Sequence, residues 1–225
     1  MNQRGQAAGW RQFGRADLGI DPVAACPVLL GGVLEATSTD GTVTARIVEV
    51  EAYRGADDPA SHAYRGRTAR NAVMWGPAGH LYVYFVYGMH FCANVVCAGD
   101  GQAGAVLLRA AEITDGQDLA AARRPAARTA RDLARGPARL TAALGLTREH
   151  DGVDLTAPDS PVRLRAGEQV EPGEVERGPR VGVAAAGDVP WRFWLPGSRA
   201  VSRYRPGGRG GANGPDPVAT SRLEG

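Results

Sequence analysis

The stretch Thr42–Tyr53 reads T-V-T-A-R-I-V-E-V-E-A-Y, and it predicts a long β-strand that begins after the turn signal S-T-D-G at 38–41. Side chains alternate between the two faces of a strand, so Glu49, Glu51 and Tyr53 would share one face. The apolar residues between them suit a protein core. The face with the two carboxylates is either the solvent-exposed side of an edge strand or the wall of a site that uses an acid.

A second stretch predicts a β-hairpin. Leu81–Val86 and Phe91–Cys97 read as strands, and Tyr87-Gly88-Met89-His90 joins them, with Gly88 free to adopt a positive φ. The chain has six tyrosines, and five of them lie between Tyr53 and Tyr87. Strand propensity explains Tyr82 and, in part, Tyr84. A large aromatic side chain at a hairpin tip tends to be exposed, however, and Tyr87 is therefore a candidate for binding a partner.

The remaining elements are predicted from caps, propensity and breakers. A helix begins at Asp21-Pro22 and its apolar run extends to Leu34, with Pro27 as a kink or an early end. Residues 54–79 predict a long ordered loop with one short helix near Thr68–Trp75. Further strands are expected at Ala105–Ala111, Val162–Ala166, Arg180–Ala184 and Trp191–Leu195, and further helices at Asp115–Arg124, Thr129–Arg135 and Gly136–Leu144. Because strands and helices do not alternate regularly, the pattern favours an α+β fold with a mainly antiparallel sheet.

The 225 residues include no lysine, and all 26 basic residues are arginine. No side-chain amine can form a Schiff base, so a covalent imine mechanism is not expected. The net charge of +2 is compatible with nucleic-acid binding without proving it. Arg65, Arg67 and Arg70 fall within six residues of the long loop. They are either a solvated charge run or a set of phosphate contacts.

Other features limit the class of protein. The three cysteines, Cys26, Cys92 and Cys97, form no pairable framework, which fits a reduced cytoplasmic compartment. The polar start of the chain does not resemble a signal peptide, and no apolar stretch is long enough for a membrane span. No compact zinc motif, nucleotide-binding loop or serine-hydrolase elbow occurs, so we predict no metal and no cofactor. We expect one domain at 18–205, between a flexible segment at 1–17 and a disordered tail at 206–225.

Four ordered motifs, E-A-Y, S-H-A-Y-R-G-R-T-x-R-N, Y-V-Y-F-V-Y-G-M-H-F-C-x-N and V-L-L-R-A, resemble the alkyladenine (3-methyladenine) DNA glycosylase family. The resemblance is strongest from Ile47 to Ala111 and continues through G-P-A-R-L, R-G-P-R-V-G-V and P-W-R-F-W to about Tyr204. The segment 115–135 matches poorly. The resemblance implies a single α+β domain with a curved, mainly antiparallel sheet, flanking helices and a protruding hairpin that wedges into DNA.

The resemblance also implies roles for individual residues. Glu51 would be the general base that activates the attacking water, and Arg109 would help hold the flipped nucleotide. Four residues would form the pocket for the extruded base: Tyr53 and His62 on its two faces, Tyr84 at its edge, and Asn94 at its floor, where it clashes with the exocyclic amine of guanine. Tyr87 would fill the gap left in the duplex. The positions aligned with DNA-backbone or wedge contacts are Arg67, Thr68, Met89 and His90.

The function implied is that of a monofunctional DNA glycosylase, which flips out and excises 3-methyladenine, 7-methylguanine and, as further candidates, hypoxanthine or ethenoadenine, and leaves an abasic site. An alkylated purine is cationic and departs without prior protonation, so one carboxylate can suffice where glycoside hydrolysis uses two. The expected partner is double-stranded DNA with damaged purines, bound by a monomer in the cytoplasm, at the nucleoid. Two alternatives stay open: a non-catalytic damaged-DNA binding module, which does not need Glu51, and an enzyme on an unrelated small molecule, which does not need Tyr87.

Overall fold

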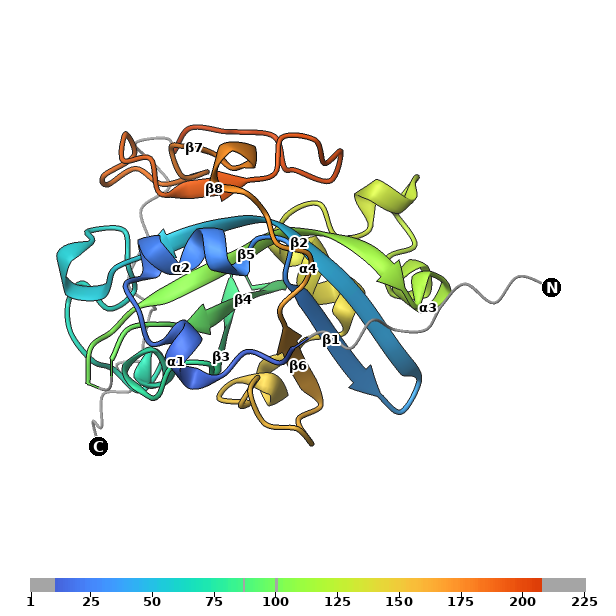
Figure 1. Cartoon of the computed structure of the whole chain (residues 1–225), viewed down its shortest axis with the longest axis horizontal. Helices are drawn as coiled ribbons and strands as arrows, with labels where there is room; N and C mark the ends of the chain where they lie inside the picture. The colour runs from blue at the N-terminus through green and yellow to red at the C-terminus, as the bar shows by residue number, and fades with distance from the viewer. Residues whose placement is uncertain (1–10, 87, 100, 208–225) are drawn as a thin grey trace, which may run out of the picture.

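The structure is a computed structural model that describes residues 11–86, 88–99 and 101–207. Its strands are β1 (Val33–Ser38), β2 (Gly41–Tyr53), β3 (Leu81–Val86), β4 (His90–Val96), β5 (Ala105–Asp115), β6 (Val162–Arg165), β7 (Glu176–Gly178) and β8 (Arg192–Trp194). They form one sheet in the order β3-β4-β5-β2-β1-β6, with β8 paired to β2 and β7 (Figure 1). Each of these pairings is antiparallel, and the sheet curls, so the predicted α+β fold with a curved antiparallel sheet is confirmed.

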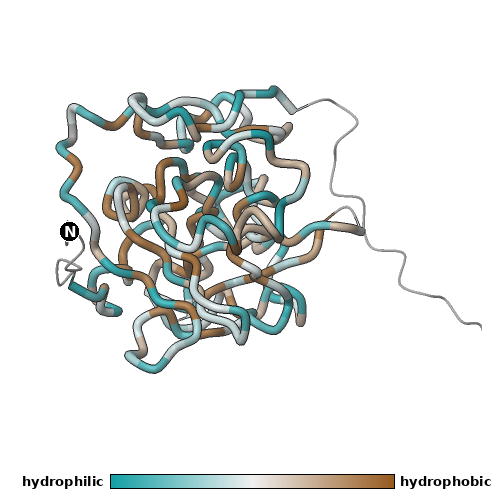
Figure 2. The backbone as a smooth tube through the Cα atoms, turned by 90° about the vertical axis from the view of Figure 1, so that its right-hand side faces the viewer, coloured by the Kyte–Doolittle hydropathy of each residue, from teal (hydrophilic) through white to brown (hydrophobic). Residues whose placement is uncertain are grey.

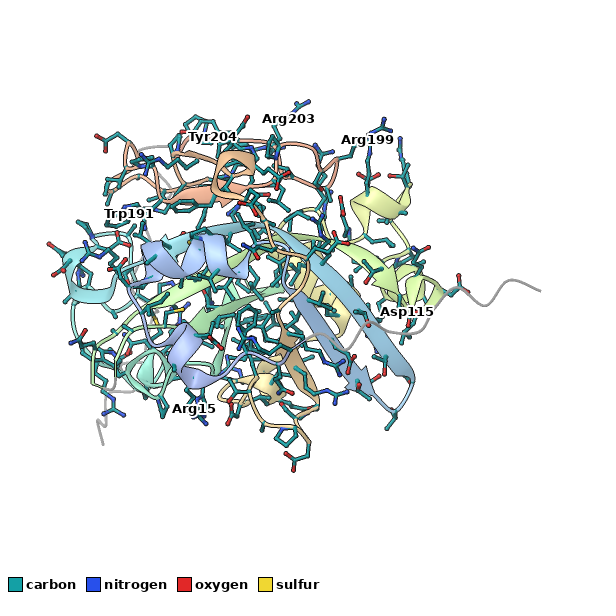
Figure 3. The ribbon with its side chains drawn as sticks, in the orientation of Figure 1. Arg15, Asp115, Trp191, Arg199, Arg203 and Tyr204 are labelled. Carbon is teal, nitrogen blue, oxygen red and sulfur yellow. The ribbon has the colours of Figure 1, made fainter. Side chains whose placement is uncertain are left out.

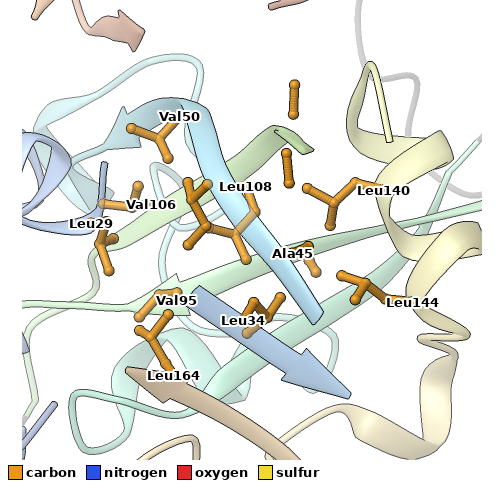
Figure 4. Packing of buried hydrophobic residues seen from close by; sticks show 14 of the residues in the cluster. Leu29, Leu34, Ala45, Val50, Val95, Val106, Leu108, Leu140, Leu144 and Leu164 are labelled. Atoms are coloured by element: carbon orange, nitrogen blue, oxygen red, sulfur yellow. The ribbon is translucent and has the colours of Figure 1, made fainter. Parts of the chain in front are cut away.

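Short helices flank the sheet. They are α1 (Arg15–Leu18), α2 (Pro22–Leu29), α3 (Gln117–Arg123) and α4 (Pro137–Leu144), with 3-10 turns η1 (Gly55–Asp57), η2 (Ala72–Trp75), η3 (Ala130–Asp132), η4 (Arg148–His150) and η5 (Pro172–Glu174). Leu140 and Leu144 of α4 and Leu29 of α2 join the buried cluster that the sheet residues form (Figure 4). Hydrophobic residues gather inside the molecule and hydrophilic ones follow its outer loops (Figure 2). The helices thus pack their apolar side chains against those of the sheet and complete the hydrophobic core.

Strand β2 is the centre of the fold. It pairs with β5 along one edge, and along the other with β1 and then, at Glu49–Glu51, with β8. The register with β5 shifts between Ile47 and Val50, and bulges of this kind bend a strand and re-aim its side chains. The C-terminal segment around β7 and β8 lies across this part of β2 (Figure 1). As a result, every residue from 47 to 52 is buried.

Several predicted elements agree closely with the structure. The strand expected at Thr42–Tyr53 starts one residue earlier, and β3 has the predicted bounds. Helix α4 has Gly136 at its N-cap, and it ends at Gly145, which adopts a left-handed φ of 70°. Strands β3 and β4 pair as the expected hairpin. The tip residue Tyr87 lies outside the described residues, so the protrusion of the hairpin and its entry into DNA stay predictions.

Other predicted elements are wrong. The helix expected to reach Leu34 ends at Leu29, because Leu30 is already extended with a ψ of 138°. Gly31 then turns the chain with a φ of 76°, and β1 begins at Val33. Pro27 lies inside α2 without ending it. The helix expected at Thr129–Arg135 is only the turn η3, since Arg135 instead forms a β-bridge with β5.

Residues 180–184 are not a strand, and the pairing with β8 is made by β7, just before them. At the N-terminal end, residues 11–17 overlap the segment that we expected to be flexible. There Gln12 forms a β-bridge with Arg165, and Phe13 is buried. Residues 1–10 and 208–225, which hold the rest of that segment and most of the expected tail, lie outside the described residues.

Candidate active site

Glu51 is completely buried and accepts three hydrogen bonds. The Tyr53 hydroxyl donates to Oε2 over 3.0 Å, and Arg109 Nη1 donates to the same oxygen over 3.2 Å. The backbone N–H of Val181 donates to Oε1 over 2.7 Å. Donors to a carboxylate favour its charged form. The structure therefore brings together three residues that the sequence analysis singled out, Glu51, Tyr53 and Arg109, and adds Val181 from the C-terminal segment.

Glu49 lies two residues earlier and is also completely buried. It accepts hydrogen bonds from Arg109 Nε (3.0 Å), Arg192 Nε (2.7 Å) and both the backbone N–H (2.6 Å) and the hydroxyl (2.8 Å) of Ser202. The interpretation of the two glutamates as a solvent-exposed face of an edge strand is wrong. The face is covered because the C-terminal segment supplies Arg192 and Ser202, which no alternation pattern in β2 reveals.

Arg109 connects the two carboxylates. Burial works against its charge, but Glu51 and Glu49 outweigh this, and the pKa of Arg109 lies above its ordinary value. For Tyr53, burial is the main effect and the negative charge of Glu51 adds to it, so the pKa of its hydroxyl lies well above the ordinary value. The guanidinium thus stays charged and the phenol stays protonated, and both remain donors to Glu51.

His62, Tyr82 and Tyr84 form an aromatic group. The ring of His62 stands edge-on to Tyr84, with 4.5 Å between ring centroids, and its Nδ1 lies 3.1 Å from the hydroxyl oxygen of Tyr82. Burial, and secondly the charge of Arg70, lower the pKa of His62 to about 4. The imidazole is therefore neutral at neutral pH. Tyr82 is nearly completely buried, in agreement with a role in the core.

Tyr84 and Cys92 link the aromatic group to the carboxylates. Tyr84 faces Cys92 across β3 and β4. Burial, and then the nearby Cys92 and Tyr53, raise the pKa of Tyr84 well above its ordinary value. Burial also raises the pKa of the Cys92 thiol to about 11, with Arg109 and Glu51 close enough to act on it. Tyr53 in turn bonds directly to the Glu51 carboxylate.

Asn94 is buried on β4, and its side-chain amide donates to the Tyr82 carbonyl over 3.1 Å. Asn71, which the sequence analysis did not single out, holds the loop that carries His62. Its side-chain amide donates to the carbonyls of His62 (2.9 Å) and Gly66 (3.0 Å), and its oxygen accepts from Thr68 N–H over 2.7 Å. The loop is therefore an ordered support for the aromatic group.

The residues expected to contact DNA are not part of this buried cluster. Arg67, Thr68, Met89 and His90 are all exposed, and among the described residues Met89 is the most exposed large hydrophobic one, at 68 %. Tyr87, expected between the two groups of exposed residues, lies outside the described part of the chain. The arrangement is a buried polar centre with exposed basic and apolar side chains on the loop and the hairpin next to it.

Sequence reasoning missed the C-terminal contribution to the site. Val181, Arg192 and Ser202 all contact the buried carboxylates, and Arg180 is buried beside Tyr53. The signal was present in R-G-P-R-V-G-V and P-W-R-F-W, two motifs quoted for the resemblance but given no role. Trp191, the second residue of the P-W-R-F-W motif, is labelled in Figure 3.

Three further observations concern the rest of the described residues. They contain no group of three or more side chains arranged to hold a metal ion. Within the same residues, no helix is both long enough and apolar enough to cross a membrane. A surface cavity of about 460 Å³ is lined by Asp21, Arg54 and Trp75 among others, and it contains none of the residues expected to form the site.

Comparison with known proteins agrees with this arrangement. Residues 17–199 match the family described as methylpurine-DNA glycosylase (MPG). A protein of Streptomyces avermitilis that carries the name "Putative 3-methyladenine DNA glycosylase" is 55 % identical over 80 % of this chain and 85 % of its own length. Proteins with the same name are 53 % identical in Nocardia farcinica (84 % and 90 % covered) and 52 % identical in Mycobacterium tuberculosis (88 % and 97 % covered). The chain therefore belongs to the methylpurine-DNA glycosylase family, a family of hydrolases that cleave N-glycosidic bonds in DNA.

Proposed function

We propose that this protein is a monofunctional 3-methyladenine DNA glycosylase, which flips an alkylated purine out of duplex DNA and hydrolyses its bond to deoxyribose. The observation that carries the proposal is the buried Glu51 carboxylate, held by Tyr53, Arg109 and Val181 next to an aromatic group. A surface glutamate needs no such support. A carboxylate needs such support if it must take a proton from water beside a developing positive charge.

The hydrogen bonds of Glu51 leave one acceptor position for a water molecule. An ionised carboxylate has about four acceptor positions. Three are used, two on Oε2 and one on Oε1. The remaining position on Oε1 can accept a hydrogen bond from the attacking water. Glu51 then takes a proton from the water while the water oxygen bonds to the sugar carbon. The purine departs with the electrons of the glycosidic bond.

The aromatic residues suit a charged leaving group. Methylation at N3 or N7 gives the purine a positive charge, and electron-rich rings such as Tyr53 and Tyr84 attract cations, by roughly 0.5–2 kcal/mol each. His62 is neutral and adds no repulsion. We propose that Tyr53 and His62 contact the faces of the base, that Tyr84 closes its edge, and that Asn94 rejects guanine at the pocket floor. With no lysine in the chain, the product is an abasic site without strand cleavage.

Base flipping requires contacts outside the pocket, because the target atom cannot be reached inside a duplex. We propose that Tyr87 fills the gap in the stack, and that Arg67, Thr68, Met89 and His90 lie along the duplex. The partner is then double-stranded DNA with a damaged purine, bound by a monomer. The three free cysteines fit a reducing cytoplasm, where the enzyme would act at the nucleoid.

The experiment that tests this function is a panel of duplexes, each with one lesion: 3-methyladenine, 7-methylguanine, hypoxanthine or ethenoadenine. We expect release of free methylated base and alkali-labile abasic sites, without strand breaks before alkali and without a protein–DNA adduct after borohydride. Tight binding of the methylated duplexes with no base release would instead identify a damaged-DNA binding module. Absence of both binding and release would contradict a function on DNA.

A further inference from the structure

Arg180 is completely buried behind Tyr53, between two aromatic rings. Its guanidinium carbon lies 4.8 Å from the ring centroid of Tyr53 and 5.1 Å from that of Trp191. Its Nη1 donates to the carbonyl of Ala52 over 3.0 Å. A cation therefore already occupies one face of Tyr53. Tyr53 itself is only partly buried.

Asp58 neutralises this cation. Its two carboxylate oxygens accept from Nη1 and Nη2 of Arg180 over 2.5 and 2.8 Å, and the pair has no exposure to solvent. Burial opposes the charge of Arg180, and the hydrogen bonds and charge of Asp58 outweigh burial, so that the pKa of Arg180 lies above its ordinary value. Neither Arg180 nor Asp58 touches Glu51 through a hydrogen bond, and the proposed hydrolysis does not use them.

The buried charges of the described residues balance as a whole. They are three acids and three arginines: Glu49, Glu51, Asp58, Arg109, Arg180 and Arg192. Arg109 and Arg192 bond to the glutamates, and Asp58 is the one buried acid among the described residues to which Arg180 bonds. Removing Asp58 would leave one uncompensated positive charge on the far side of Tyr53, which is the worst position for it if the base on the near side is also a cation.

We propose that the Asp58–Arg180 pair sets the preference of this site for positively charged purines: Arg180 fixes the Tyr53 ring from behind, and Asp58 cancels the charge that would otherwise repel the base. The inference rests on the proposed function, in which a cationic purine stacks on Tyr53. Asp58 and Arg180 are positioning and specificity-determining residues, because they act through the ring and do not touch the base.

Distance and dielectric give the size of the effect. Stacked groups lie about 3.5–4 Å apart, which puts the guanidinium and a base on opposite faces of the ring roughly 8 Å from each other. At an effective dielectric constant of about 20, one uncompensated charge at that distance changes the affinity for a cation by roughly thirtyfold. The affinity for a neutral base of the same shape does not change through this effect.

The test uses two duplexes with lesions of the same shape and different charge. One contains 7-methyladenine on a 2′-fluoro sugar, which is cationic and resists cleavage, and the other contains 7-methyl-7-deazaadenine, which is neutral and is not cleaved. Dissociation constants for both are measured with the full chain and with Asp58→Asn, Arg180→Gln and the double variant. Release of 3-methyladenine from methylated DNA by the wild type is measured in parallel.

Asp58→Asn should lower the ratio of cation to neutral affinity by roughly thirtyfold. Arg180→Gln should raise that ratio, and the double variant should return it toward the wild-type value even if both affinities fall. Equal losses for the two duplexes would overturn the proposal and leave the pair a purely structural role. If Asp58→Asn does not fold, the Arg180→Gln variant still tests the proposal, because an unchanged ratio of cation to neutral affinity in that variant also overturns the proposal. A wild type that neither prefers lesion DNA nor releases base would instead refute the function itself.

Discussion

At the scale of residues, Glu49 and Glu51 show what a sequence pattern can and cannot reveal. Their spacing correctly places both carboxylates on one face of β2, and the resemblance singled out Glu51. The pattern cannot show that this face is buried, because the residues that cover it, Val181, Arg192 and Ser202, lie at least 130 positions further along the chain. Only the folded chain assigns Glu49 to the network that holds Arg109.

His62 gives a prediction about pH. Its pKa is about 4 in the folded protein and 6.5 in the unfolded chain, so stability from the neutral imidazole is complete above pH 6.5 and is lost as the pH falls toward 4. This group should contribute a loss of about 2–3 kcal/mol in unfolding free energy by pH 4. Urea unfolding of the wild type and His62→Gln at both ends of this range measures it. An identical pH dependence in the two proteins would contradict the low pKa.

At the scale of elements, local signals were sufficient where a cap or breaker was clear. Gly136-Pro137 and Gly145 predicted both ends of α4, and the run of aromatic and β-branched residues at Leu81–Val86 predicted β3. The apolar run before Leu34 was ambiguous between helix and strand, and the chain divides it into α2 and β1 at Gly31. The long loop was predicted as ordered, but its central support, Asn71, was quoted only as the last residue of a motif and was given no role.

Asn71→Ala should loosen the loop that carries His62. The substitution removes three side-chain hydrogen bonds, and we expect a loss of about 2–4 kcal/mol in unfolding free energy. Amide hydrogen exchange should become faster mainly at residues 62–71, and affinity for lesion DNA should fall. Thr147→Ala, which removes the cap of η4 in a different loop, is the matched control. Unchanged exchange in the loop of the Asn71 variant would show that other contacts hold it.

At the scale of the whole molecule, the distribution of charge matters more than its sum. The net charge of +2 is the small difference between 26 arginines and 24 acidic residues. The buried arginines are paired with acids, whereas Arg65, Arg67 and Arg70 are exposed. This division could not be predicted from composition, because it depends on which acids the fold brings to which arginines. It leaves surface arginines available for phosphates.

Binding to DNA should therefore depend strongly on salt. Each phosphate contact contributes about −0.9 to the slope of log affinity against log salt concentration, so about four contacts would reduce affinity about a hundredfold for a fourfold increase in salt. Titration of a lesion duplex at several salt concentrations gives the slope. Replacing Arg67 with Gln should reduce the slope by about one unit, and replacing the exposed Arg148, on η4, serves as control. A slope near zero would contradict phosphate contacts.

The most direct measurement is single-turnover release of 3-methyladenine or 7-methylguanine by Glu51→Gln, with binding of the same duplex measured alongside. The amide keeps the size of the side chain but cannot take a proton from water, so the rate should fall about a hundredfold to ten-thousandfold while affinity changes little. Glu149→Gln, at an exposed glutamate on η4, should behave as the wild type. A Glu51→Gln protein that releases base at the wild-type rate would contradict the assignment of the buried carboxylate as the catalytic base.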